Sequence, residues 1–195
     1  MRHEAANIIR DEHRSLAALV HGMQFLVREI RTKGRGPDYQ LLHAMLYYIR
    51  EFPERLHHPK EDQHLFAAIK RRTHDADAAI ADLEREHTQG EALLNELTVA
   101  LSTYEAGAAG GLDRFAANVD RFADFYWKHM QKEEDVVLPV AERALTDVDW
   151  RDIHTAFSAN RDPTYAGNTE EEFRRLFTRI VNLAPAPIGL GSAQD

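Results

Sequence analysis

The sequence predicts an all-α protein, an up-down-up-down four-helix bundle followed by two shorter helices. Three observations support this fold. Four long stretches repeat apolar residues every three or four positions, the breaks between them are short enough to make neighbours antiparallel, and the second half partly repeats the first. We expect residues 1–146 to form the bundle and residues 147–195 to form a C-terminal helical extension and tail.

The first and third predicted helices each carry a histidine within their apolar stripe. The first stripe runs from Ile9 to Ile30 and includes His13, and a Gly-Pro cluster directly after this helix ends it. The third stripe runs from Ile80 to Tyr104 and includes His87, and glycines again follow it. Both histidines are therefore expected to face the core.

The second and fourth predicted helices differ in regularity. The second covers about residues 38–73 and contains Pro53 and Pro59. Each proline removes a backbone donor and disfavours helical geometry in the residue before it, so we expect a kink or a break there. The fourth helix has a regular stripe from Phe115 to Val140.

Two shorter helices are predicted after the bundle. Thr146, followed three residues later by Asp149, predicts the start of one, and Thr169 with Glu172 predicts the start of the other. The residues from Ala184 onward read as an irregular tail.

Composition restricts the possible functions. The chain has 195 residues, no cysteine and a net charge of −8. Thiolate metal sites, iron–sulfur clusters and disulfides are excluded, and the acidic balance argues against a nucleic-acid partner. No signal peptide and no membrane-spanning run are recognisable, so we expect a soluble cytoplasmic protein with no membrane partner.

One phrase of the sequence occurs twice. His57-His-Pro-Lys-Glu61-Asp is followed 72 residues later by His129-Met-Gln-Lys-Glu133-Glu. In each copy the histidine and the first glutamate are four residues apart, which places them on the same side of a helix. An imidazole nitrogen and a carboxylate oxygen from each copy can therefore reach one site.

A second pair repeats at nearly the same separation, Glu12-His13 and Glu86-His87. Each half therefore supplies one histidine, then a histidine with a glutamate. Ionised glutamates in a bundle core would cost several kcal/mol each without a proton, a cationic partner or a metal. A metal centre accounts for all of these residues together, and nitrogen and oxygen donors suit iron or manganese better than zinc.

Counting coordination positions favours two metal ions. Two six-coordinate metal ions have twelve coordination positions in total. Two bridging glutamates and one oxygen bridge would fill six of these positions, and four histidines would fill four more. Glu91 could fill one of the two that remain, which leaves one for an external ligand. Ala17 stands at the matching place in the first half, so the repeat is broken there. The predicted metal ligands are His13, His57, Glu61, His87, Glu91, His129 and Glu133.

Two alternatives remain for the ligand set. His58 and Asp62 are also four residues apart, but aligning the two Lys-Glu pairs selects His57, with His58 as the reserve. A different di-metal pattern, Glu-x-x-His, occurs as Glu61-x-x-His64 and Glu84-x-x-His87. It ignores the repeat and leaves three of the stripe histidines unexplained.

Over about residues 6–146, these motifs resemble the hemerythrin-like proteins, also called HHE cation-binding domains. The resemblance implies a non-haem di-iron centre in a four-helix bundle, with an open position for dioxygen or a related small ligand. It also implies that His13, His57, His87 and His129 are terminal ligands and that Glu61 and Glu133 are bridges.

The sequence departs from the oxygen-carrying members of that family. Those members have His-x-x-x-His on the third helix and a carboxylate five residues after the last histidine. Here Glu91 replaces the second histidine, and Glu133 follows His129 by four residues. The pattern is closer to branches involved in nitrosative stress and iron sensing, which argues against oxygen transport.

Three classes of function follow. The first is a di-iron protein that binds O2, NO or peroxide for sensing, protection or iron handling. The second is a di-iron enzyme that turns over peroxide or NO or oxidises Fe(II), although the sequence assigns no proton donor. The third is a metal-free interaction bundle. The sequence does not settle whether the protein is an enzyme, and it says nothing of its oligomeric state.

Overall fold

The computed structural model describes residues 2–34, 36–159, 175, 178 and 180–182. All elements assigned within these residues are helical, as predicted, and none is a strand. In chain order they are α1 (Arg2–Lys33), α2 (Tyr39–Ile49), η1 (Arg50–His57), α3 (His58–Lys60), η2 (Glu61–Phe66), α4 (Ala67–Arg72), α5 (Asp77–Glu105), α6 (Gly111–Lys132), η3 (Glu133–Val137), α7 (Leu138–Ala144) and α8 (Asp147–Ser158).

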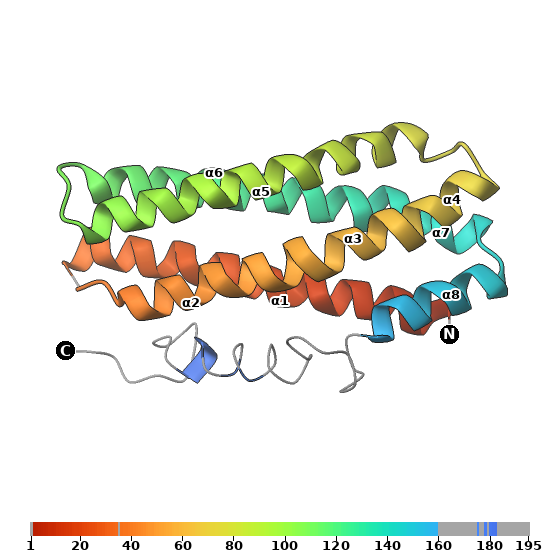
Figure 1. The fold of residues 1–195 in the computed structure, drawn as a ribbon, viewed down its shortest axis with the longest axis horizontal. Helices are drawn as coiled ribbons and strands as arrows, with labels where there is room; N and C mark the ends of the chain where they lie inside the picture. Colours follow the sequence, from red (N-terminus) through yellow and green to blue (C-terminus); the bar gives the residue numbers. More distant parts are fainter. Residues whose placement is uncertain (1, 35, 160–174, 176–177, 179, 183–195) are drawn as a thin grey trace.

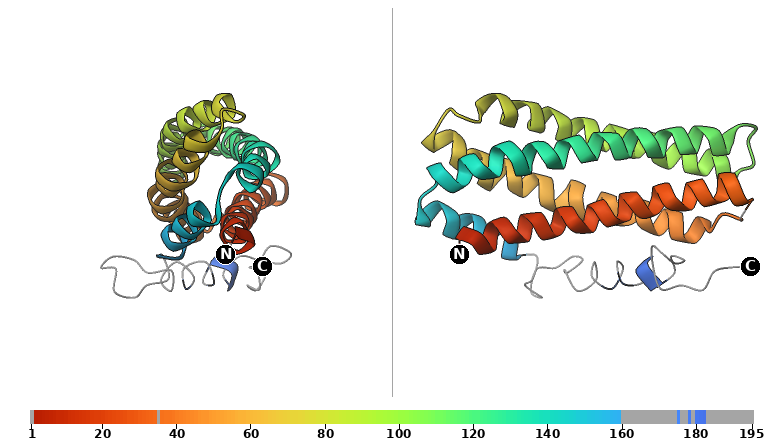
Figure 2. Two further views of the ribbon diagram at one scale, coloured as in Figure 1. Left: turned by 90° about the vertical axis from the view of Figure 1, so that its right-hand side faces the viewer. Right: turned by 180° about the vertical axis from the view of Figure 1, so that it is seen from behind.

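The long helical stretches lie side by side as a bundle (Figure 1). Turns connect successive stretches at alternating ends, and the end-on view shows the stretches arranged around a common axis (Figure 2). The helix α5 packs on α6, and α6 packs on α1. Each stretch therefore presents one face to the same interior.

A kink or a break was expected at the prolines of the second stretch; the stretch is helical without interruption from Tyr39 to Arg72, so there is no break. Pro53 lies inside the π-helical segment η1, where the amide of His58 bonds to the carbonyl of Pro53, five residues back. Pro59 lies in the first turn of α3. The chain therefore stays helical although both prolines lack a backbone donor, and Pro53 lies where the amides bond five residues back.

The interior has two apolar clusters with a polar layer between them. Cluster A lies toward the α1–α2 turn and includes Leu19, Met45, Leu97 and Phe122. Cluster B lies toward the other end, and includes Ile9, Phe66, Leu83 and Val137. In all four stretches the predicted ligands lie where one cluster gives way to the other in sequence, and Met130 of the second motif copy belongs to cluster A.

The helix α8 begins as the sequence predicts. The side chain of Thr146 accepts a hydrogen bond from the amide of Asp149, and the Asp149 carboxylate accepts one from the amide of Thr146, which completes a capping box. The helix packs against α1 and η2, and its Trp150 and Phe157 join cluster B.

The second helix predicted after the bundle, beginning at Thr169, lies outside the described residues. Within the described part of this region, Ile180 is buried in cluster A. Among the helices that the structure describes, none combines the length and the apolar character needed to cross a membrane.

Candidate metal centre

The polar layer brings together six of the seven predicted metal ligands. The helix α1 contributes one, the second stretch two, α5 one, and the stretch formed by α6 and η3 two. None of the six side chains is more than 8% exposed. They are His13, His57, Glu61, His87, His129 and Glu133.

On one side of the layer, His13 and His57 face each other. Their Nε2 atoms are 3.2 Å apart. Nε2 of His13 lies 3.1 Å from Oε2 of Glu133, and Nε2 of His57 lies 3.3 Å from Oε1 of Glu61. These two imidazole nitrogens and two carboxylate oxygens would be the donors for a metal ion on this side.

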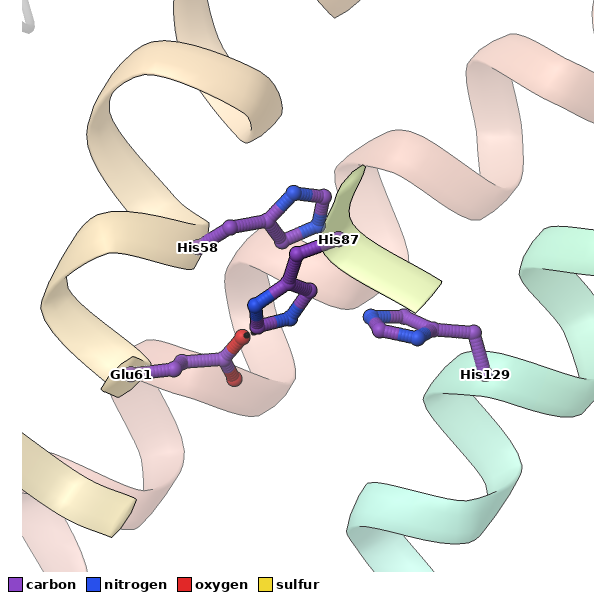
Figure 3. Close-up of side chains that lie close together, drawn as sticks. All are labelled: His58, Glu61, His87 and His129. Carbon is purple, nitrogen blue, oxygen red and sulfur yellow. Dashed lines mark ion pairs between the residues drawn. The ribbon is translucent and has the colours of Figure 1, made fainter. Parts of the chain in front are cut away.

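On the other side, His87 and His129 approach the same two carboxylates. Nε2 of His87 is 3.5 Å from Oε2 of Glu61, and Nε2 of His129 is 3.2 Å from Oε1 of Glu133. Figure 3 shows His87, His129 and Glu61 converging from three different helical stretches. The two glutamates therefore lie between two pairs of histidines.

Acidic side chains fix the outer nitrogen of the first histidine pair. Nδ1 of His57 donates to Oε2 of Glu12 over 2.6 Å, and Nδ1 of His13 donates to Oε1 of Glu134 over 2.9 Å. A hydrogen bond at Nδ1 orients the ring and leaves Nε2 to face the centre.

The second pair is held in the same way. Nδ1 of His87 donates to Oδ1 of Asp62 over 3.0 Å, and Nδ1 of His129 donates to Oε2 of Glu86 over 3.1 Å. Glu86 also accepts a hydrogen bond from Lys132.

These four acids form a closed ring around the bundle. Each acid is adjacent in sequence to a predicted ligand of its own stretch, and it holds the histidine of a neighbouring stretch. The sequence alone predicts Asp62 and Glu134 to be solvated or to support the site, and it predicts no role for Glu12 or Glu86. Glu12 and Glu86 directly precede His13 and His87 in the repeated Glu-His pairs, and this repeated position is the sequence feature that could have indicated their role.

Burial and charge shift the histidine pKa values in opposite directions. Burial lowers the pKa of His57, but the charge of Glu61 and the hydrogen bond to Glu12 outweigh it and raise the pKa to about 9. Burial likewise lowers the pKa of His87, but the hydrogen bond to Asp62 and the nearby carboxylates of Glu133 and Glu61 outweigh it and raise the pKa to about 12. Without a metal, these rings therefore bind protons at neutral pH.

The glutamates show the complementary effect. Burial raises the pKa of Glu133, and so does the charge of Glu61, but the histidines outweigh both and lower the pKa to about 2. Burial also raises the pKa of Glu61, but the neighbouring His57 and His13 outweigh this effect and lower the pKa well below its usual value. The layer thus keeps two ionised carboxylates in the core.

The carboxylates have unused bonding capacity. None of the four oxygens of Glu61 and Glu133 receives a hydrogen bond from the described part of the chain, although histidine Nε2 atoms lie 3.1–3.8 Å away. Nε2 of His87 and of His129 also lacks a hydrogen bond. Buried, ionised and unsatisfied oxygens facing histidine nitrogens fit a bound cation.

Local backbone geometry contributes to the position of the ligands. His57 ends the π-helical segment η1, and Glu61 and Glu133 begin η2 and η3. Such wider turns are frequent at functional sites. Both copies of the repeated motif therefore contain the same local departure.

The structure does not bring Glu91 to the cluster. Its side chain is exposed on α5, and the interior position next to it is Gly90. The rival Glu-x-x-His pattern is not assembled either, because Glu84 pairs with Lys70 at 2.6 Å and is partly exposed. Its other histidine, His64, is only half-buried.

His58, the reserve ligand, is buried beside the second side of the layer. One ligand atom from each of His58, Glu61, His87 and His129 lies within 4.8 Å of the others, and His13, His57 and Glu61 form a similar group. Burial lowers the pKa of His58, and the charges of His87 and His57 add to this effect against the opposing influence of Glu54.

The fold and this cluster define an all-helical protein whose core can hold a metal cation. Residues 4–141 match the family model described as hemerythrin HHE cation binding domain, which covers most of the chain. The chain belongs to the hemerythrin HHE cation-binding domain family. Searches of curated proteins and of solved structures gave no match.

Proposed function

We propose that the protein is a non-haem di-iron protein that binds O2, NO or peroxide at an open iron position. Its role would be sensing, protection or iron handling. The proposed metal ligands are His13, His57, Glu61, His87, His129 and Glu133.

The observation that carries this proposal is the arrangement of the two buried glutamates. Each has a histidine Nε2 from both sides within 3.8 Å, and their four oxygens receive no hydrogen bond from the described residues. Two carboxylates between two pairs of histidines offer donors for two cations with shared bridges. A single cation would leave one histidine pair unused.

The donor set is compatible with iron. It combines imidazole and carboxylate without sulfur, which suits iron or manganese, with zinc as a weaker fit. A bound iron pair would supply redox chemistry and a position for an exchangeable small ligand.

The chain's own groups prepare this site. Clusters A and B exclude water on both sides of the polar layer. The ring of Glu12, Asp62, Glu86 and Glu134 fixes the histidine orientations before a metal arrives. Preorganised donors lose less conformational freedom on binding.

The competing function is an enzyme that uses the same centre on peroxide, NO or Fe(II). One observation favours it. The hydroxyl of Tyr126, a fully buried side chain, donates to Glu54 next to the histidine cluster. Sequence reasoning found no such proton-bearing group.

Optical spectra of the iron-loaded, reduced protein separate the two functions. Exposure to air, NO or peroxide, followed by removal of the ligand, should produce bands that form and disappear reversibly if the protein binds the ligand. Irreversible oxidation, or repeated consumption of added peroxide or NO, would instead establish an enzyme or an iron-oxidising role. A spectrum unchanged by all three ligands would contradict the proposed open position.

A further inference from the structure

We propose that α8 is a movable cover over the metal centre and that its Phe157 limits the rate of entry and the size of the external ligand. The inference rests on the proposed function, because it assigns an entry route to the ligand of that centre. The helix α8 lies outside residues 4–141, so membership of the family does not imply such a cover.

Phe157 lies directly against the first histidine pair. Only 1% of the residue is exposed, and its ring meets that of His57 edge-on, with the centroids 5.9 Å apart. Nζ of Lys60 lies 6.0 Å from the centroid of the phenyl ring, a distance at which a cation is attracted to an aromatic face. Because His57 and Lys60 are three residues apart, Phe157 rests on one turn of the second stretch, beside a proposed ligand.

The second histidine pair is covered by the bundle itself. Phe66 stacks on His87 with ring centroids 5.8 Å apart, and Phe125 stacks on His129 at 6.1 Å. Both phenylalanines belong to helical stretches of the bundle, so displacing them disturbs its packing. Phe157 is instead held by a peripheral helix of 12 residues. The first pair therefore has the covering ring that is easiest to displace.

The helix α8 occupies the side of the bundle between α1 and η2 (Figure 2). It packs against both of them, whereas α1 and η2 are not among the pairs of elements that pack closely on each other. The helix α1 carries His13, and η2 begins at Glu61. Movement of α8 therefore opens the side of the layer on which His13 and His57 face each other.

Two features of α8 act in opposite directions on its movement. Arg72 donates to both oxygens of Asp149, over 2.9 and 3.1 Å, and so holds the first turn of the helix in place. Nε1 of Trp150 opposes the closed position, because this fully buried donor finds no acceptor among the described residues. Water can accept its hydrogen bond once α8 moves, so part of the cost of opening is recovered.

Stopped-flow mixing of NO with the reduced, iron-loaded protein tests the inference. Phe157→Ala should raise the association rate constant at least about 10-fold, because the smaller side chain leaves the entry open. The gain should be larger for nitrosobenzene, a bulkier ligand that also binds through a nitroso group. Phe157→Leu, which keeps an apolar side chain in cluster B, should give a smaller gain and decides the question if the alanine variant does not fold.

The ion pair gives a second variant with a matched control. Asp149→Asn should raise the association rate constant about 3-fold, because it loosens the helix but keeps the ring. Asp152→Asn, on the exposed face of α8, should leave the rate constant unchanged.

A covalent lock tests the movement itself. Because the chain has no cysteine, Arg72→Cys combined with Asp149→Cys supplies two thiols that a short bis-maleimide can join. The linked protein should bind NO about 10-fold more slowly than the same protein before linking. Equal rate constants before and after linking would show that entry does not require α8 to move, and would overturn the inference.

Fluorescence of the metal-free protein gives a readout that needs no iron. In the background of Trp127→Phe, Trp150 is the only tryptophan. Acrylamide should quench its emission more strongly in Asp149→Asn than in Asp152→Asn, because a loosened α8 exposes the indole more often. Equal quenching, or an association rate constant that Phe157→Ala leaves unchanged, would also overturn the inference. Wild-type protein that binds iron but no NO, O2 or peroxide would contradict the proposed function first, and the inference would fail with it.

Discussion

Each of the four predicted histidine ligands is positioned by an acid from a neighbouring helical stretch. Glu12 holds His57, for example, and Glu86 holds His129. Removing such an acid leaves the donor atoms in place but frees the ring to rotate. The ring of acids therefore couples the precision of the centre to the packing of the whole bundle.

Gly90 and Tyr126 offer a direct test of packing beside the centre. Gly90→Ala should destabilise the protein by about 1–3 kcal/mol through overpacking, more than the gain of about 1 kcal/mol from better helix propensity. The cost should fall in the background of Tyr126→Phe, because the oxygen that the new Cβ meets is gone. Urea unfolding of the four proteins gives the coupling free energy.

Gly36→Ala is the control for this cycle, since nothing lies within 4 Å of an added Cβ there. Its effect should be the same with tyrosine or phenylalanine at position 126. An equal cost of Gly90→Ala in both backgrounds would show that the close approach of the hydroxyl is not what keeps position 90 a glycine.

At the residue scale, the repeat was sufficient to predict six candidate ligands that the structure brings together. It could not predict which way Glu91 points, because positions 90 and 91 differ by about 100° around the helix and only packing decides between them. Likewise, the partners of Glu12 and Glu86 depend on which helices are neighbours. Sequence spacing within one helix contains no such information.

The second helical stretch differs from the expected regular helix at the repeated motif. Its prolines predict a kink or a break, and the chain has no break but remains helical through η1, α3 and η2. Propensity rules describe the regular α-helix, in which proline removes a bond and causes a clash. Here the stretch stays helical through π-helical segments, which these rules do not describe.

The helix α8 lies outside residues 4–141, the part of the chain that matches the family model, yet it packs against the bundle. Its Phe157 meets the ring of His57 edge-on at 5.9 Å and so covers the first histidine pair. Asp149 fastens this helix, because Arg72 donates to its two oxygens over 2.9 and 3.1 Å and Thr146 donates to one of them. The hydrogen bond from Arg72, and then those from Thr146, outweigh burial and lower the pKa of Asp149 to about 2.

The variant Asp149→Asn should unfold at a lower urea concentration than the wild type at neutral pH. The carboxylate has a lower pKa in the folded state than the usual 3.8, so it stabilises the fold above that pH. This stabilisation is lost as the pH falls through about 2. The difference in unfolding free energy between wild type and variant should therefore narrow below pH 3.8.

Asp152→Asn on the exposed face of α8 serves as the control and should change little at any pH. A difference between wild type and Asp149→Asn that stays constant across the acid range would argue against an ionised, paired Asp149.

For the whole molecule, the apolar stripes predicted the helical fold, because burial of one face per helix dominates the energetics of a bundle. The stripes could not show that the interior is divided into clusters A and B by a polar layer. That layer puts two ionised carboxylates in the core, an arrangement that is costly without a compensating cation. The division of the core and the metal centre are therefore one feature.

The number of iron ions bound per chain tests this central claim most directly. Metal-free protein is loaded with Fe2+ in the absence of oxygen, freed of excess metal, and analysed for iron and protein. The arrangement of the six buried ligands predicts two ions per chain. A value below one ion per chain in folded protein would contradict a two-metal centre.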